Sequence, residues 1–469
     1  MTTISDFADA VTKISIAVLV LSAAVVVVVA IVNAHRARRR EQIVLADIGE
    51  LVMPGGEAHS AAPSLSPWLR QRVRNELMQQ RHNARHLSEA VLAGDSATGT
   101  SALALPVELN VARGEAAIFG AAQDTLATLT QGLTAMAPDR AEGFLGAMSA
   151  LLPRPHGYLV RTMPIARGAE PNPRIGLSVE LAELDGPPIA ARTFWEPEAG
   201  PPEALQERLL DLVEPTARWI AVRLIAVRTE VRSGTGAAKL PAETATAFHR
   251  LLVGGLCRTA MDDFDSHAAT FAEDAGAELR SAADAMRGYY RPWEMLAGIH
   301  EELGRNYTRR ERRDDAETAF RRAQHAWQRA EKLLAGRAHP PADTLERLRV
   351  RRLKCQVLAN RTEGRPLVVQ ELSDRPLTLE SMQMRTLYNT ACLYATLAGE
   401  FMDEAKDAVG RTVLAEPEQD VRTYALRDPE LLAIPGLATF LNRLVSLRGQ
   451  TAEPIRGDEA AALITKAKE

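Results

Sequence analysis

The chain has 469 residues, more than one hydrophobic core usually holds, so we expect two or three folded units. Its formal net charge of −4 is small for this length, which argues against a global field that attracts nucleic acid. Cys257, Cys355 and Cys392 lie far apart and form no C-x-x-C pair, which argues against both a disulfide framework and a cysteine zinc site.

An apolar stretch near the N-terminus predicts a membrane-spanning helix. Residues 14–33 are almost uniformly apolar, and a helix of that length spans about 30 Å, the thickness of a bilayer's hydrocarbon core. Four arginines follow within 34–41, and the basic flank of a span stays in the cytoplasm. We therefore expect a single-pass plasma-membrane protein with residues 1–13 outside and the body of the chain in the cytoplasm. A cleaved signal peptide would carry its basic residues before the apolar core instead.

Residues 42–230 are expected to form a small α+β domain. A short apolar run predicts a strand at 43–46, and Ser66-Pro67 opens a helix. Apolar and polar residues then alternate, which predicts an antiparallel meander of three strands at 157–165, 175–181 and 189–195. Further helices are expected at 123–136 and 140–152. One more helix is expected to end near Val213, and a separate one to begin at Glu214-Pro215.

A glycine-containing stretch at 231–240 is expected to link this domain to a helical one. Strand patterns disappear beyond it, and apolar residues recur at helical spacing through 241–448, followed by a tail at 449–469. The predicted fold class is therefore α+β and all-α: one transmembrane helix, a small α+β domain with an antiparallel meander, and a helical domain.

Small and large residues recur at fixed spacing between 297 and 330. Small side chains stand where paired helices approach closely, and large ones where the space between helices must be filled. These positions are Gly304, Ala316 and Ala323, and Leu303, Tyr307 and Phe320. The segment resembles a tetratricopeptide repeat, and 385–417 resembles one more weakly. An irregular helical bundle with Ala-rich packing is the alternative.

The resemblance implies a groove that binds a protein or peptide. Matching by position to the family's ligand-contacting side chains gives Glu301, Arg305, Thr308 and Arg309, with Asn389 from the weaker repeat. Arg305 and Arg309 lie one helical turn apart, where two guanidinium groups can hold an acidic partner group. Alternatively, both arginines pair with Glu301 and Glu302 on an exposed helix face.

No sequence pattern supports catalysis, so we expect no enzyme, no cofactor and no metal. Three patterns come near to known sites but lack required members. His82 and His86 have the spacing of two zinc ligands, but no third ligand accompanies them. The acidic cluster from Asp262 to His267 lacks the glycine and the distal glutamate of a calcium loop, and Gly234 to Lys239 does not have the residue order of a P-loop. Arginine clusters at 305–313 and 347–354 are interspersed with carboxylates, so we expect solvated mixed-charge faces and no nucleic-acid site.

Two functions are consistent with these patterns. The first is a membrane-anchored cytoplasmic scaffold that binds a protein or peptide partner, an acidic one included, in the helical groove. The second is a membrane-tethered sensor whose α+β domain binds a small ligand and whose helical domain relays the signal or assembles partners.

Overall fold

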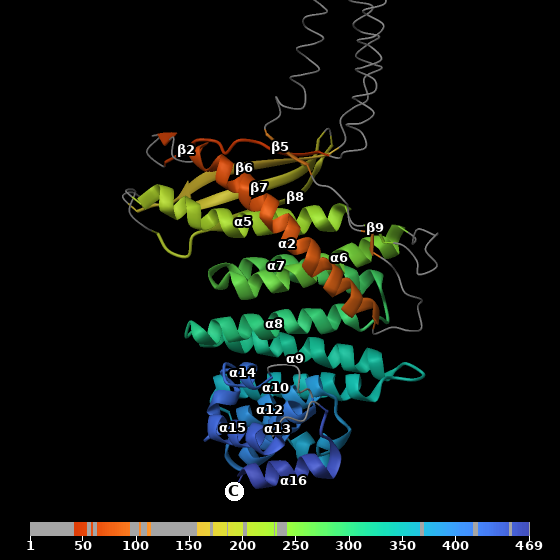
Figure 1. The fold of residues 1–469 in the computed structure, drawn as a ribbon. Coiled ribbons are helices and arrows are strands. Elements are labelled where there is room, and N and C mark those ends of the chain that lie inside the picture. The colour runs from red at the N-terminus through yellow and green to blue at the C-terminus, as the bar shows by residue number, and fades with distance from the viewer. Residues whose placement is uncertain are drawn as a thin grey trace, which may run out of the picture. The chain divides into compact units, whose positions relative to one another are not determined.

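The computed structural model describes residues 42–53, 58–59, 63–93, 103–104, 110–113, 157–168, 172–184, 186–199, 204–228, 230–231, 242–365, 370–415, 421–449 and 453–468 (Figure 1). They fall into two compact units. The first contains the described residues up to Asn83 and those from Ala104 to Thr229; the second contains Ala84–Leu103 and everything from Glu230 onward. The helices expected at 123–136 and 140–152, and nearly all of the expected linker, lie outside the described residues.

The expectation of a membrane-spanning protein is corrected by the structure. Among the residues described above, no helix is both long and apolar enough to cross a bilayer. The fold class of this part of the chain is therefore mostly helical with a small mixed sheet, without a transmembrane helix. Residues 14–33, on which the span, the bilayer contact and the plasma-membrane location rested, lie outside the described residues. None of these three inferences is carried further.

The first unit is built on a five-stranded sheet in the order β5-β1-β6-β7-β8. Its strands are β1 (Gln42–Leu45), β5 (Asn110–Arg113), β6 (Gly157–Arg167), β7 (Arg174–Glu183) and β8 (Pro188–Trp195). The pairings β6–β7 and β7–β8 are antiparallel, as the alternation of side chains predicts. The sheet is nevertheless mixed, because β1 pairs in parallel with both β5 and β6. Ile43, Val44 and Leu45 are buried in this central position, which explains their uninterrupted apolar run.

The part of helix α2 (Ser66–Ala93) up to Asn83 and helix α5 (Leu205–Arg228) complete this unit, and α5 packs against β7 and β8. The inward-facing Ile175, Leu177, Val179 and Leu181 of β7 are at most 1% exposed. The sequence predicts a helix break at Pro215, but α5 continues through it. A proline removes one backbone hydrogen bond from a helix, and burial of the apolar stripe on both sides of Pro215 offsets this loss. Short elements here are β2 (Leu51–Val52), β3 (Ala58–His59) and η1 (Pro63–Leu65); β4 (Leu103–Ala104) and β9 (Glu230–Val231) lie near the unit boundaries.

The second unit is a succession of packed helices. It begins with α6 (Ala242–Asp263), η3 (Asp265–His267), α7 (Ala268–Ala285), α8 (Arg291–Arg309), α9 (Arg313–Ala335) and α10 (Ala342–Thr362). Figure 1 shows α7, α8, α9 and α10 stacked in chain order. On α9, Ala316, Phe320 and Ala323 are at most 2% exposed, and Tyr307 of α8 packs against the cluster formed by Ala316, Phe320 and Ala359. Leu303 is half-buried.

The C-terminal helices share one core. They are α11 (Gln370–Asp374), η4 (Leu379–Ser381), α12 (Met384–Leu397), η5 (Gly399–Phe401), α13 (Met402–Ala415), α14 (Val421–Ala425), η6 (Leu431–Ala433), α15 (Leu437–Arg448) and α16 (Gly457–Lys468). Residues 449–469, which we read as a tail, thus contain α16. Its Ala460, Ile464 and Ala467 lie at helical spacing and are buried in the core shared with α12, α13 and α15.

Candidate functional site

The residues expected to line a groove, four on α8 and Asn389 on α12, contact other groups of this same chain. Glu301 is fully buried, and the Arg305 side chain is 33% exposed. The exposed Thr308 donates its hydroxyl proton to the backbone oxygen of Gly304 at 2.9 Å, and Arg309 pairs with Asp265 at 2.8 Å. Asn389 accepts a hydrogen bond from Arg351 at 3.2 Å. The predicted groove residues therefore do not form one open surface.

Glu301 is the centre of a buried set of charges. One carboxylate oxygen lies 2.8 Å from Lys354 Nζ and 3.0 Å from Arg305 Nη2, and the other accepts a bond from Arg351 Nε at 2.9 Å. Glu430, from the segment after α14, accepts bonds from Arg305 at 3.0 Å and from Lys354 at 3.1 Å. We call Glu301, Arg305, Arg351, Lys354 and Glu430 the Glu301 network.

The titration of this network follows from its geometry. Burial alone would raise the pKa of Glu301, but Arg351, Lys354 and Arg305 outweigh it and hold that pKa well below its usual range. Burial likewise opposes charge on Lys354, yet Glu301 and Glu430 raise its pKa above the ordinary value. All members therefore stay charged near neutral pH. A partner's carboxylate would have to displace Glu301 or Glu430 from Arg305, so this arginine is not available to a partner.

The expected mixed-charge face on α10 is also less solvated than its sequence suggests. Arg349 and Lys354 are each 1% exposed. Arg349 pairs with Glu346 at 2.8 Å and with Glu371 at 3.1 Å. Long basic side chains spaced along a helix look like a solvated face in sequence, and only their carboxylate partners from other elements show that the face is covered.

Three polar groups around Cys392 are close enough to hold a cation: its thiol and the carboxylates of Asp428 and Glu430. However, Tyr388 donates a hydrogen bond to Asp428 at 2.8 Å, and Glu430 already binds two cationic side chains. Burial also raises the pKa of the Cys392 thiol well above its ordinary value, which keeps the thiol protonated. The two carboxylates are therefore already bound by Tyr388, Arg305 and Lys354 of this chain.

Two of the patterns that resemble metal sites in sequence, the histidine pair and the acidic cluster, lie partly or wholly within the described residues. His82 lies exposed on α2, and the side chain of His86 is outside the described residues. Asp265 does not point to a free cation site, because it binds Arg309, Arg310 and Asn306.

Arg258 on α6 is the feature that sequence reasoning missed. Its guanidinium group lies over Gly298 of α8, where an added Cβ would come within 2.8 Å of Nη1. Within the described residues it makes no hydrogen bond and no ion pair, although Glu301, Glu302 and Asp262 lie in its surroundings. Burial, and then Arg351, lower its pKa against the opposing effect of these carboxylates. No motif marks this arginine, because only the packing of α6 on α8 shows that its donors lack a partner.

Comparison of the chain with protein-family models, with curated proteins and with solved structures found no match.

Proposed function

We propose that the helical unit is a scaffold that binds a protein partner beside α6 and α8, where Arg258 receives an acidic group of that partner. The single observation that carries the proposal is the guanidinium group of Arg258, which has no ion-pair or hydrogen-bond partner among the residues that the structure describes. It is only partly exposed and lies next to the cationic Arg351. A largely desolvated charge without a hydrogen-bond partner is unfavourable, and a bound carboxylate can satisfy two of its donors at once.

The resemblance of α8 and α9 to a tetratricopeptide repeat supports the same proposal, because that family presents a groove to polypeptides. The Glu301 network occupies the position at which we expected the partner, so the proposed contact moves from Arg305 to Arg258. A catalytic role finds no support, since the buried acids of this region are ion-paired and the buried thiols of Cys355 and Cys392 have raised pKa values.

The test compares two arginines that differ in their pairing. Arg258→Met should leave the midpoint of thermal unfolding unchanged or higher, because it removes an unpaired, largely buried charge. Arg351→Met should lower the free energy of unfolding by about 3 kcal/mol, because it takes away a partner of the buried Glu301.

Partner binding is then followed by a photo-crosslinking residue placed in the full chain at the exposed Thr259, next to Arg258. The crosslinked peptide of the partner is identified by mass spectrometry. We expect a segment with acidic residues, and about tenfold less crosslinking in Arg258→Met. The proposal fails if the crosslinked segments are not acidic, or if Arg258→Met crosslinks as well as the original chain.

A further inference from the structure

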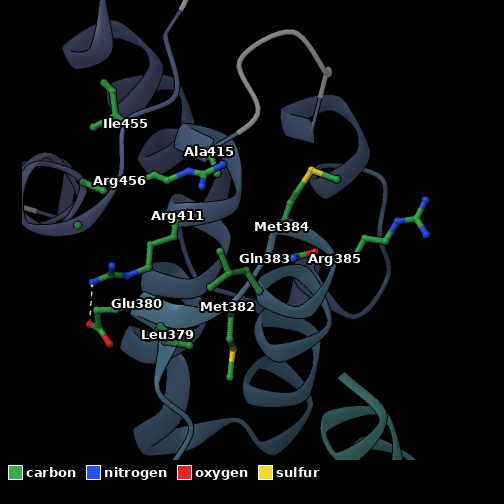
Figure 2. Close-up of a pocket in the computed structure, with 13 residues that line it drawn as sticks. Leu379, Glu380, Met382, Gln383, Met384, Arg385, Arg411, Ala415, Ile455 and Arg456 are labelled. Carbon is green, nitrogen blue, oxygen red and sulfur yellow. Dashed lines mark ion pairs between the residues drawn. The ribbon is translucent and has the colours of Figure 1, made fainter. Parts of the chain in front are cut away.

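A pocket of about 470 Å³ lies in the second unit between the segment before α12, the end of α13 and the start of α16. Figure 2 shows Met382 near its centre, Ile455 and Arg456 on one side, and Met384 and Arg385 on the other. The volume falls within the range of ligand-binding clefts in proteins and is much larger than a single carboxylate or phosphate needs. This pocket shares no residue with the Glu301 network or with Arg258.

The charges at the pocket are unbalanced. Glu380 is its one carboxylate, and it pairs with Arg411 at 3.3 Å; Arg411 also binds Asp407 at 3.0 Å. Arg385 and Arg456 are exposed and make no ion pair within the described part of the chain. In Figure 2 the Arg456 side chain reaches toward Ala415, whereas Arg385 points away from the other arginines. Arg456 is therefore the cation best placed to meet a ligand inside the pocket.

Two helices add to this positive potential. Met384 is the first residue of α12 and Gly457 is the first of α16, and both line the pocket. The amino-terminal end of a helix carries a partial positive charge and backbone N–H groups without helical partners, so both ends favour an anion. The acidic residues in the first turn of α16, Asp458 and Glu459, do not line the pocket.

The remaining lining is apolar. Leu379, Met382, Met384, Leu387 and Ile455 contribute side chains, and all five belong to the C-terminal core of this unit or pack against it. Methionine side chains adapt to differently shaped partners, which is useful on a surface that receives a polypeptide. A bare anion would leave this apolar part unused, whereas a peptide with alternating acidic and apolar side chains would contact both.

We propose that this pocket binds an acidic peptide segment of a partner protein, with a carboxylate at Arg456 and an apolar side chain against Met382 and Leu387. The site is separate from the one proposed at Arg258, so either proposal can fail without the other.

The experiment measures fluorescence anisotropy of labelled peptides of about eight residues with the full chain. One peptide alternates Glu and Leu, and its twin has Gln in place of Glu. We expect saturable binding of the acidic peptide and at least about tenfold weaker binding of the neutral twin. Arg456→Glu should weaken binding of the acidic peptide by about tenfold or more, and Arg385→Glu by less, because Arg385 points away.

Arg443→Glu is the matched control, since Arg443 is exposed on α15, makes no ion pair among the described residues and does not line the pocket. It should change the dissociation constant less than about twofold, with the same net charge as Arg456→Glu. Because Arg443 and Arg456 are both exposed, the midpoint of thermal unfolding should be the same in Arg443→Glu, in Arg456→Glu and in the original chain. The proposal is overturned if the acidic peptide does not bind, if the neutral twin binds equally, or if Arg456→Glu and Arg443→Glu lose affinity for the acidic peptide equally. Displacement of the peptide by about 10 mM inorganic phosphate at constant ionic strength would also overturn it, because it would reveal a site for small anions.

Discussion

His300 is a buried imidazole group that the fold keeps uncharged. Its side chain is on α8, and the residue is 9% exposed. Nδ1 has no hydrogen-bond partner among the described residues. Burial, assisted by Arg322 and Arg280, lowers its pKa from 6.5 to about 4. The buried ring therefore stays neutral near neutral pH and can take up a proton in acid.

This histidine predicts a specific loss of stability in mild acid. The folded pKa of about 4 lies below the unfolded value of 6.5, so the unfolded chain binds the proton first as the pH falls. The contribution to stability is complete above pH 6.5 and is lost toward pH 4. Between pH 7.5 and pH 5 the free energy of unfolding should fall by about 2 kcal/mol through this residue.

Denaturant titrations of the original chain and of His300→Gln at both pH values measure this effect. The variant should lose about 2 kcal/mol less than the original chain. Glu301, Glu294 and Glu430 have lowered pKa values, so their contributions are lost mainly below the ordinary value of 4.5 and do not obscure this window. Equal losses in both proteins would show that His300 is not held neutral.

At the scale of elements, the packing of α8 on α9 depends on one missing side chain. A Cβ added at Gly304 would lie 2.6 Å from the ring of Phe320, closer than real Cβ contacts allow. Phe320 is 2% exposed and packs with Ala316 and with Ala359 of α10. The ring therefore has little room to move away, and the spacing of Gly304 and Phe320 sets the distance between the two helices.

Gly304→Leu should consequently lower the free energy of unfolding by about 1–3 kcal/mol through overpacking. Gly336→Ala is the control, because the nearest atom to its new Cβ is 3.5 Å away and its backbone is in the right-handed helical region. Combining Gly304→Ala with Phe320→Leu should recover part of the loss that Gly304→Ala causes alone, which a double-mutant cycle by chemical denaturation detects. Strictly additive losses would mean that the two residues do not limit each other.

Several elements of both units could be predicted from the sequence, because their signals come from residues close together in the chain. The alternation in β7 acts between neighbouring residues, and Gly304 and Phe320 lie on two helices that follow each other in the chain. The parallel pairing of β1 could not be predicted, since a short apolar run does not specify its neighbours.

The candidate sites depend on contacts that sequence patterns do not record. Glu301 meets Arg351 across 50 residues, and Arg305 meets Glu430 across 125 residues. In sequence, Arg305 therefore looked free for a partner. Arg258 is the converse case, because nothing in its neighbourhood along the chain shows that it lacks a partner within the described part of the structure.

At the scale of the whole molecule, one helix contributes to both compact units. Helix α2 runs from Ser66 to Ala93, but the first unit takes its residues through Asn83 and the second takes those from Ala84. Leu77 is 3% exposed in the first part. Leu87, in the second part, contacts the position of Gly255 on α6. A cut of the chain at 231–240 would therefore separate the second unit from part of its own packing.

This arrangement predicts that the two units unfold in separate events. A substitution in one part of α2 should destabilise only the unit to which that part belongs. Leu77→Ala should destabilise the first unit by about 2–5 kcal/mol, because it leaves a cavity in a core. Leu87→Ala should destabilise the second unit by about 1–2 kcal/mol, because this leucine is only half-buried. Hydrogen exchange of the full chain measures both: Leu77→Ala should accelerate exchange in β6 to β8 and leave α8 to α10 unchanged, and Leu87→Ala should do the reverse. If either substitution accelerates both sets of amides equally, the chain unfolds as one cooperative body, and the division into two units has no thermodynamic meaning.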